Sequence, residues 1–446
     1  MTTVRQYRYL AAAALSTAAI LTLSACSSGS GSTAGGGKSP TVVPSTRGEG
    51  KTLTVWVMDG DYTDATLSAI NTKFTAATGA KVDVQVQQWD GITTKISTAL
   101  STTGTPDVLD LGNTQVPGFA ANGGLLDLTA YQDDLKQGRT WLAGLADPAT
   151  VDGSLYAVPG FAGARAVIYN KKTWAAAGIT QAPTTYAELT AALDTIKAAN
   201  PAADFSPFYL PGQYWFAGLQ FIWDAGGEIA NNDGGTWKGA FAADAGQKGL
   251  AEFRTFQNAY STPASQTLDT LVPDQTQLFA DGKTSAVLAT SGSIGLIQKA
   301  NPKITTADLG TFPFPGTSGK NQPVMLGGSD WGIATKSDAH DLALQWTKIA
   351  ASPAVQDKNV FGNDGWIPNS TEGIQAAQPS LNEQQQGFFA AALTSKATPA
   401  AAQWPTIEGD KSINQVFSAV ASGAKTPADA GKEFDAHLGT TLAAGR

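Results

Sequence analysis

Leu53-Thr54-Val55-Trp56-Val57-Met58 is a short apolar strand, and the stretch that it opens decides the fold. A helical pattern follows over residues 64–78, and Lys81-Val82-Asp83-Val84-Gln85-Val86 then alternates as a second strand. Another helical pattern covers residues 92–100, before the third strand Pro106-Asp107-Val108-Leu109-Asp110-Leu111. Strands that alternate with helices form a parallel sheet, because each helix carries the chain back to the start of the next strand. The stretch therefore predicts an α/β fold.

A second α/β lobe is expected to begin near Gly153. The chain of 446 residues is longer than one hydrophobic core usually serves, so two packed lobes are expected. An apolar run over residues 164–169 precedes a helix that Thr184 or Thr185 caps before Glu188. Further strands are expected at residues 283–289 and 323–335, and helices at residues 415–422 and 428–442.

The N-terminal region predicts export from the cytoplasm. Arg5 and Arg8 precede an apolar run over residues 10–23, which is shorter than the roughly 20 residues that span a bilayer. The run ends in Leu23-Ser24-Ala25-Cys26, which resembles the lipobox of bacterial lipoproteins. That resemblance implies that residues 1–25 are a cleaved signal and that Cys26 carries a diacylglycerol on the outer face of the cell membrane. The alternative is a chance cysteine beside an ordinary secretory signal.

Composition limits the classes of function. Removing the two arginines of residues 1–25 leaves 27 basic against 37 acidic residues, a net charge of −10, which excludes nucleic acid as a partner. Cys26 is the only cysteine, so there is no intrachain disulfide and no thiolate metal site. We also find no metal-ligand cluster, phosphate loop or dinucleotide fingerprint, and we expect no cofactor.

Several landmarks, in order along the chain, resemble the sugar-binding family of extracellular solute-binding proteins of bacterial ABC importers, which includes maltose-binding protein. Besides the strand with Trp56 they are FTAATGAKV (74–82), GTPDV (104–108), GLLDL (124–128), LYAVP (155–159), IYNK (168–171), AGI (177–179), PTTYAEL (183–189), AGG (225–227) and FADGK (279–283). The resemblance implies two lobes joined by crossovers and a ligand held in the cleft between them. It also implies a membrane permease as partner, and we expect a monomer.

The expected domain boundaries follow from the crossovers, which should fall near residues 160–165, near residues 310–316 and after residue 352. The chain is then divided into a signal peptide (1–25), the lipidated Cys26 with a flexible Gly/Ser tether (26–50), an N-terminal lobe (51–162 plus 312–355) and a C-terminal lobe (163–311 plus 356–446). The 24 tether residues after Cys26 span on the order of 27 Å.

Candidate ligand-binding residues lie first in the loops that leave the three opening strands, because ligands bind beyond the carboxyl ends of parallel strands. These candidates are Asp61, Gln88 and Asn113, whose carboxylate and amide groups suit sugar hydroxyls. For Asp61 helix capping or turn formation is the competing interpretation. The family places a carboxylate close to this point, which favours Asp61 as a ligand contact.

Arg165 stands inside an apolar run at the expected hinge, where an unpaired charge is costly. A salt bridge and a ligand contact both account for it. Tyr214-Trp215-Phe216 precedes the AGG landmark by about the spacing of the aromatic sugar-stacking residues in maltose-binding protein. We expect one of the three to stack on a sugar ring, with Tyr214 and Trp215 as the candidates, although core packing uses the same residue types.

The run Gly327-Gly328-Ser329-Asp330-Trp331 interrupts a strand, and an acidic residue is disfavoured in a plain core strand. We therefore expect ligand to approach Gly328, with Asp330 and Trp331 beside it. Ser293 lies in the loop where maltose-binding protein has a tryptophan, so stacking has to come from elsewhere. Trp366 and Trp404 are the substitutes, with a buried structural role as the alternative for both.

The sequence thus predicts an extracytoplasmic lipoprotein that binds a disaccharide or oligosaccharide and delivers it to an ABC permease. It is not expected to be an enzyme, because the chain has no nucleophile-elbow pattern. A polyamine-binding protein is the alternative, since carboxylates and aromatic rings also bind cations. A secreted glycosidase would need two facing carboxylates, which Asp61, Asp330 and Glu228 could supply. A structural surface lipoprotein would have no closing cleft.

Overall fold

The structure is a computed structural model that describes residues 41–443, and the strands expected from the opening stretch are present and parallel. β1 (Thr52–Met58) pairs in parallel with β2 (Lys81–Gln87) on one side and with β3 (Val108–Gly112) on the other. α1 (Asp64–Thr78) and α2 (Ile92–Ser101) connect them. The α/β prediction is confirmed, because two helical crossovers return the chain to the same edge of the sheet.

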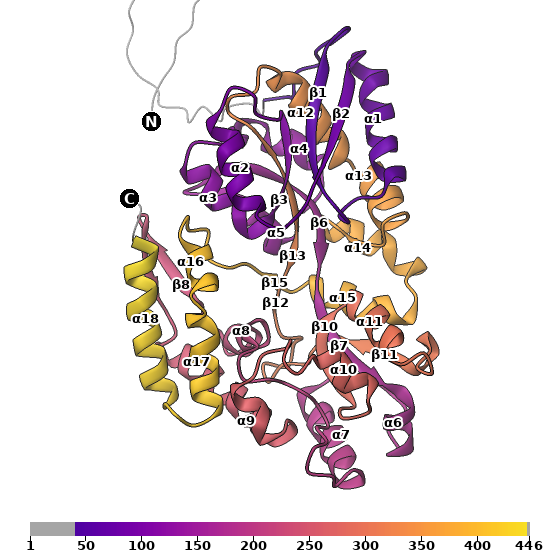
Figure 1. The fold of residues 1–446 in the computed structure, drawn as a ribbon, viewed down its shortest axis with the longest axis vertical. Helices are drawn as coiled ribbons and strands as arrows, with labels where there is room; N and C mark the ends of the chain where they lie inside the picture. Colours follow the sequence, from indigo (N-terminus) through magenta and orange to yellow (C-terminus); the bar gives the residue numbers. More distant parts are fainter. Residues whose placement is uncertain (1–40, 444–446) are drawn as a thin grey trace, which may run out of the picture. The chain divides into compact units, whose positions relative to one another are not determined.

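The first sheet has six strands in the order β14-β6-β13-β3-β1-β2. β13 (Gly327–Ile333) runs antiparallel between β3 and β6 (Ala157–Gly163), and β14 (Ile367–Pro368) pairs with the far side of β6. The centre of the sheet is therefore completed by a strand from a distant part of the chain (Figure 1).

The second sheet has β7 (Arg165–Asn170) at its centre, with β10 (Ala286–Thr290) and β11 (Leu309–Phe312) antiparallel on either side. Only Ala164 separates β6 from β7, so the chain passes directly from one sheet to the other. We call the elements packed around the first sheet the N-lobe and those packed around the second sheet the C-lobe.

Each lobe has its own apolar core. Trp331, Trp346 and Phe74 are buried in the N-lobe core, and Trp174, Phe256 and Trp404 are buried in the C-lobe core. A third cluster contains residues from both sheets, among them Ala162 of β6 and Ile168 of β7. Packing thus continues across the point where the chain changes sheets. Within residues 41–443 no helix is both long and apolar enough to cross a membrane.

The remaining elements cover these sheets and connect them (Figure 1). The other helices are α3 (Val116–Ala121), α4 (Gln132–Lys136), α5 (Ala143–Ala146), α6 (Lys171–Ala176), α7 (Tyr186–Ala199), α8 (Trp215–Asp224), α9 (Asp244–Tyr260), α10 (Gln275–Ala280), α11 (Gly292–Ala300), α12 (His340–Ala350), α13 (Pro353–Val355), α14 (Thr371–Ala377), α15 (Glu383–Ala392), α16 (Trp404–Gly409), α17 (Ser412–Ala421) and α18 (Pro427–Ala443). Short two-stranded ladders pair β4 (Thr150–Val151) with β5 (Ser154–Leu155), β8 (Ala230–Asp233) with β9 (Thr236–Gly239) and β12 (Val324–Met325) with β15 (Ser395–Lys396).

One expected boundary differs from the observed pairing. The expected C-terminal lobe includes everything after residue 355, whereas β14 pairs with β6 in the first sheet. Asp357 also forms an ion pair of 2.7 Å with Arg139, next to α4. The chain therefore stays with the N-lobe through residue 368, because Ile367 and Pro368 complete the edge of its sheet.

A second difference concerns the expected tether, whose last ten residues are packed against the N-lobe. We call residues 41–50 the strap. The Val43 side chain is buried, and its backbone N–H donates to Asp134 Oδ2 at 2.7 Å. Thr46 Oγ1 donates to Asp341 Oδ2 at 3.0 Å, and the Gly48 N–H donates to the Thr78 carbonyl at 2.8 Å. The strap thus connects α4, α12 and the end of α1. Cys26 lies outside the described residues.

Val43→Ala tests whether the strap contributes to stability. The substitution removes two buried methyl groups, so we expect a loss of about 1–2 kcal/mol in the free energy of unfolding, measured in urea. Val42→Ala is the matched control, because the Val42 side chain is 67% exposed. Equal effects of the two substitutions would contradict a packed strap.

Candidate functional site

Two adjoining hollows lie beyond the carboxyl ends of the N-lobe strands, and both are lined by Arg165 and Thr290. We call them the aromatic hollow, with a volume of 510 Å³, and the amide hollow, with a volume of 280 Å³. The aromatic hollow has walls from both lobes: Asp61, Trp89, Phe161, Gly163, Gly327, Gly328, Ser329, Asp364, Gly365 and Trp366 with Arg165, Thr290, Ser291 and Gly292. The amide hollow lies on the C-lobe: Gln213, Tyr214, Trp215, Phe216, Asp269, Thr270, Leu271, Gln275, Ala289, Ser293, Lys411 and Asn414 with Arg165 and Thr290.

Asp61 forms part of the aromatic hollow and is held from several sides. Its Oδ2 accepts a hydrogen bond of 2.8 Å from Ser329 Oγ, and its backbone carbonyl accepts one of 2.7 Å from Trp366 Nε1. Burial raises the pKa of the Asp61 carboxyl, while hydrogen bonds from Ser329 and Trp89 lower it. Asp61 is therefore held by Ser329 and by two aromatic residues that line the aromatic hollow, Trp366 and Trp89.

Two further carboxyl groups are buried on β3 and β13, neighbouring strands of the first sheet. Asp110 and Asp330 are both fully buried, and neither oxygen of Asp330 has a hydrogen-bond partner within residues 41–443. Burial, followed by the charge of Asp61, raises the pKa of Asp110 well above its ordinary value. Burial, followed by the charge of Asp110, does the same to the pKa of Asp330. In the described part of the chain, no three His, Cys, Asp or Glu side chains are placed to hold a metal ion.

Arg165 stands at the junction of the two hollows. Its guanidinium carbon lies 3.6 Å from the centre of the Phe216 ring, and Nε donates to Tyr214 Oη at 3.1 Å. Tyr214 Oη in turn donates to the Leu288 carbonyl at 3.1 Å. No carboxylate within residues 41–443 forms an ion pair with Arg165. The guanidinium is thus oriented by neutral groups and keeps donors for an acceptor in the cleft.

Aromatic faces line both hollows. Trp366 is stacked on Phe161 with ring centres 4.6 Å apart, and Trp89 is 41% exposed. In the amide hollow, Trp215 is stacked on Phe216 with ring centres 3.8 Å apart. Such faces cover the apolar C–H side of a sugar ring or the alkyl chain of another ligand.

The structure brings seven of the twelve expected residues to the hollows. They are Asp61, Arg165, Tyr214, Trp215, Ser293, Gly328 and Trp366. At Gly328 strand pairing also requires glycine, because φ is +153° and an added Cβ would lie 2.1 Å from the Phe161 carbonyl oxygen. A small residue at this position is therefore explained without any ligand.

The other five expected residues do not line either hollow. The Asn113 side chain is buried and donates to the Gly144 and Leu326 carbonyls, both at 3.0 Å. Trp404 is buried in the C-lobe core and donates to Glu408 at 2.6 Å. Trp331 is buried in the N-lobe core, stacked on Tyr62. Asp330 is fully buried, and Gln88 is exposed, donating to Asp59 at 3.3 Å.

Several residues of the hollows were not among the candidates. Trp89 and Phe216 are direct neighbours of Gln88 and Trp215, so the correct loops were found but not every side chain in them. No pattern in the sequence marked Phe161 or Asp364 as a cleft residue. Phe161 lies in an apolar strand, and Asp364 follows η5 (Gln356–Phe361), whose position beside the cleft depends on tertiary packing.

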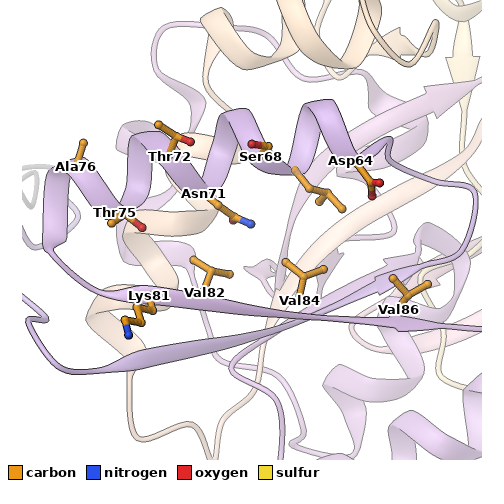
Figure 2. A pocket seen from close by; sticks show the side chains of 11 residues that line it. Asp64, Ser68, Asn71, Thr72, Thr75, Ala76, Lys81, Val82, Val84 and Val86 are labelled. Atoms are coloured by element: carbon orange, nitrogen blue, oxygen red, sulfur yellow. The ribbon is translucent and has the colours of Figure 1, made fainter.

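A larger hollow of 940 Å³ lies away from the cleft, between α1 and the edge strand β2. Figure 2 shows Asn71 and Ser68 of α1 above the row Val82, Val84 and Val86 of β2. Its lining contains no aromatic residue. It belongs to one lobe, so closure of the lobes would not enclose a ligand there. The two hollows at Arg165 are therefore the candidate site.

Comparison with known proteins agrees with this geometry. The family model described as bacterial extracellular solute-binding protein matches residues 59–357. The chain is also 36% identical over 398 residues to the diacetylchitobiose binding protein DasA of Streptomyces coelicolor, covering 88% of this chain and 90% of that protein. This chain belongs to the bacterial extracellular solute-binding proteins. The family expected from the landmarks is confirmed.

Solved structures give the same fold for this solute-binding protein. The sugar-binding protein MalE from Xanthomonas citri has a TM-score of 0.75 at 23% identity, over 88% of this chain and 98% of that one. The cyclic α-maltosyl-1,6-maltose binding protein from Arthrobacter globiformis has a TM-score of 0.71 at 21% identity, over 88% and 98%. These similarities confirm the expected two-lobed fold.

Asp330→Asn tests the cost of the buried carboxyl in this solute-binding protein. The unfolded chain releases the Asp330 proton as pH rises past the ordinary pKa of 3.8, whereas the folded chain keeps it to higher pH. Wild-type stability therefore falls as pH rises over that interval, and the asparagine variant does not suffer this loss. We expect the free energy of unfolding of the variant, relative to wild type, to rise from about pH 4 to pH 7, measured in urea. A difference that is the same at every pH would contradict a neutral buried carboxyl.

Proposed function

We propose that this protein captures a sugar of two or more rings in the cleft at Arg165 and delivers it to a membrane importer. The observation that carries the proposal is an oriented guanidinium that has no carboxylate partner within residues 41–443 and lies between two hollows with aromatic walls. A sugar needs both donors and acceptors for its hydroxyls and flat apolar faces for its rings. The two hollows supply donors from Arg165, acceptors from carboxylate and amide side chains such as Asp61 and Gln213, and flat faces from their aromatic rings.

The relative DasA gives the proposal its substrate class. Its name states that it binds diacetylchitobiose, a disaccharide that carries two acetamido groups. An acetamido carbonyl is a hydrogen-bond acceptor, and the Arg165 guanidinium supplies donors for it. We therefore take an N-acetylated disaccharide as the first ligand to be tested, with one ring placed in each hollow.

A polyamine is the alternative ligand. The carboxylates of Asp61 and Asp364 line the aromatic hollow and would attract a cation, but Arg165 lines the same hollow and would repel it. The Arg165 guanidinium, which forms no ion pair in the described part of the chain, favours a neutral or acceptor-rich ligand over a diamine. The glycosidase pair expected from the sequence does not form, because Asp330 is fully buried and Glu228 is paired with Lys396 outside both hollows.

Arg165→Ala tests the sugar proposal. Isothermal titration of the wild-type protein with N,N′-diacetylchitobiose should show one binding site, and the variant should bind at least about tenfold more weakly, a loss of about 1.4 kcal/mol. Arg47→Ala is the matched control, because Arg47 is an exposed arginine of the strap that contacts Glu49 and the Ala77 carbonyl and lines neither hollow.

Other ligands separate the alternatives. Putrescine and spermidine should give no heat with the wild-type protein. Binding of a polyamine without binding of any sugar would overturn the sugar proposal. Release of N-acetylglucosamine from the disaccharide by native protein, but not by boiled protein, would indicate a glycosidase.

The two direct connections between the sheets fit a hinge. They are the β6–β7 junction at Ala164 and the segment 313–326, which leads from β11 through β12 to β13. A third connection leads from β14 to α15. Rotation at these connections would close the lobes on the sugar, and the closed form of the monomer would be the one that the permease accepts.

The proposed location depends on Cys26. Its lipid would keep the receptor at the outer face of the cell membrane, with residues 27–40 between the lipid and the strap. We expect Cys26→Ser to abolish incorporation of labelled palmitate in the bacterial host and to release the protein into the medium. The same protein remaining in the membrane fraction after the substitution would contradict lipid anchoring.

A further inference from the structure

The segment Asp364-Gly365-Trp366 forms one wall of the aromatic hollow. It follows η5 and turns at Gly365, where φ is +75°, a left-handed conformation that glycine adopts without strain. The Asp364 N–H donates to the Asn359 carbonyl and the Trp366 N–H donates to the Val360 carbonyl, both at 3.1 Å. The backbone of this segment is therefore held by η5, while its two large side chains contact other elements.

The Asp364 carboxylate caps α1, which begins 300 residues earlier in the chain. Its Oδ1 accepts hydrogen bonds from the Thr63 N–H at 3.3 Å, from Thr63 Oγ1 at 2.6 Å and from Thr66 Oγ1 at 2.7 Å. Thr63 is the N-cap of α1, and Thr66 occupies the position at which a capping box has a glutamate or glutamine that accepts from the N-cap N–H. Asp364 takes the place of that acceptor, and its negative charge suits the positive end of the helix.

The Trp366 side chain is attached to the same loop. Its Nε1 donates to the Asp61 carbonyl at 2.7 Å. Its ring is stacked on Phe161 of β6, with ring centres 4.6 Å apart and the two planes at 19°. The indole is thus held at one edge by the loop after β1 and on one face by β6, while it lines the aromatic hollow.

The two side chains join the segment 364–366 to the residues 61–66 at two points. Without the bonds of Asp364, only the Asp61 bond and the stacking on Phe161 would hold the Trp366 side chain. A more mobile indole would have to be ordered when the ligand binds, and this ordering would reduce the affinity. Capping of α1 and the readiness of the aromatic wall are therefore coupled.

Direct contact with the ligand is the competing interpretation of Asp364, because this residue also lines the aromatic hollow. However, Oδ1 already accepts from three donors of α1 and its N-cap. Oδ2 is shielded from solvent and has no partner among the described residues. The observed contacts of the carboxylate are thus with the start of α1, which favours a role in holding the wall.

We propose that Asp364 is a positioning residue, which caps α1 and thereby holds Trp366 in place as the surface on which a sugar ring stacks. The proposal rests on the proposed sugar-binding function only in its last clause, because the capping contacts and the position of Trp366 belong to the ligand-free protein. Asp364 acts through Trp366, without touching the ligand.

Three substitutions separate positioning from direct contact. Asp364→Ala removes the acceptor, whereas Asp364→Asn keeps a side-chain oxygen for the same donors and is the conservative rescue. Thr66→Val removes one of the donors, and Thr66 is fully buried and lines neither hollow. Thr78→Val is the matched control, because Thr78 is equally buried at the other end of α1 and its hydroxyl donates to the Phe74 carbonyl.

The first measurement follows Trp366 in the ligand-free protein by nitrogen-15 NMR of the indole N–H groups. The chain has 11 tryptophans, and the Trp366 signal is the one that Trp366→Phe removes. We expect this signal to shift in Asp364→Ala, and its N–H to exchange with solvent at least about tenfold faster. Thr66→Val should change the signal in the same direction, and Thr78→Val should leave it unchanged.

The second measurement is isothermal titration with N,N′-diacetylchitobiose. We expect Asp364→Ala to bind about tenfold more weakly than wild type, Asp364→Asn within about threefold of wild type and Thr66→Val about fivefold more weakly. The double variant of Asp364→Ala and Thr66→Val should bind no more weakly than Asp364→Ala alone, because the Thr66 hydroxyl acts through the carboxylate. Thr78→Val should bind like wild type, and melting temperatures check that each variant is folded.

Each outcome decides a different claim. A Trp366 signal that is unchanged in Asp364→Ala overturns the proposal. Wild-type affinity in Thr66→Val, with weak binding in both Asp364 variants, indicates direct ligand contact and overturns it as well. A wild-type protein that binds no sugar, while Asp364→Ala shifts the Trp366 signal, refutes the proposed function and supports the positioning of Trp366 by Asp364.

Discussion

The insertion of β13 between β3 and β6 is the constraint on which the rest of the structure depends. Pairing on both edges places this strand in the centre of the first sheet, although it follows the whole second sheet in the chain. The chain must therefore cross from the N-lobe to the C-lobe at β6–β7 and return before Gly327. The interlobe cleft is a consequence of this path, because the connections that cross between the sheets lie beside the ends of their strands.

The same insertion builds the floor of the cleft. Ser329 of β13 donates a hydrogen bond to Asp61, which lies in the loop after β1. Trp331 of β13 is paired with Asp110 of β3. Three carboxyl groups, those of Asp61, Asp110 and Asp330, are then buried in the N-lobe, and none of them forms an ion pair within residues 41–443. Such groups lower the stability of the folded chain near neutral pH, because burial disfavours their charged forms.

The opening stretch of the sequence was sufficient for the fold class and not for every side chain of the site. The alternation of strands and helices over residues 53–111 predicted a parallel sheet, because burial of one face gives a helix its 3.6-residue period and a half-buried strand its period of two. Asn113 was expected in the cleft from its place after β3, but its amide is used by two backbone carbonyls that come from α5 and from the approach to β13. Trp331 and Trp404 were expected beside a ligand but are core residues. The sequence could not separate the two roles, because a tryptophan that stacks on a ligand and a tryptophan that fills a core are the same residue type.

The sequence by itself determined the α/β alternation, the loops that leave the N-lobe strands and the family landmarks. These features depend on residues that are close together in the chain, and the spacing of such residues indicates whether a segment is a helix, a strand or a loop. Only the tertiary structure decided which of two neighbours in a loop lines the cleft, as Trp89 does and Gln88 does not, and that residues 41–50 pack as a strap. It also decided that Ser329 donates a hydrogen bond to Asp61. The physical reason is that these contacts join segments far apart in the chain, and the energy of each depends on burial and partners that no single segment contains.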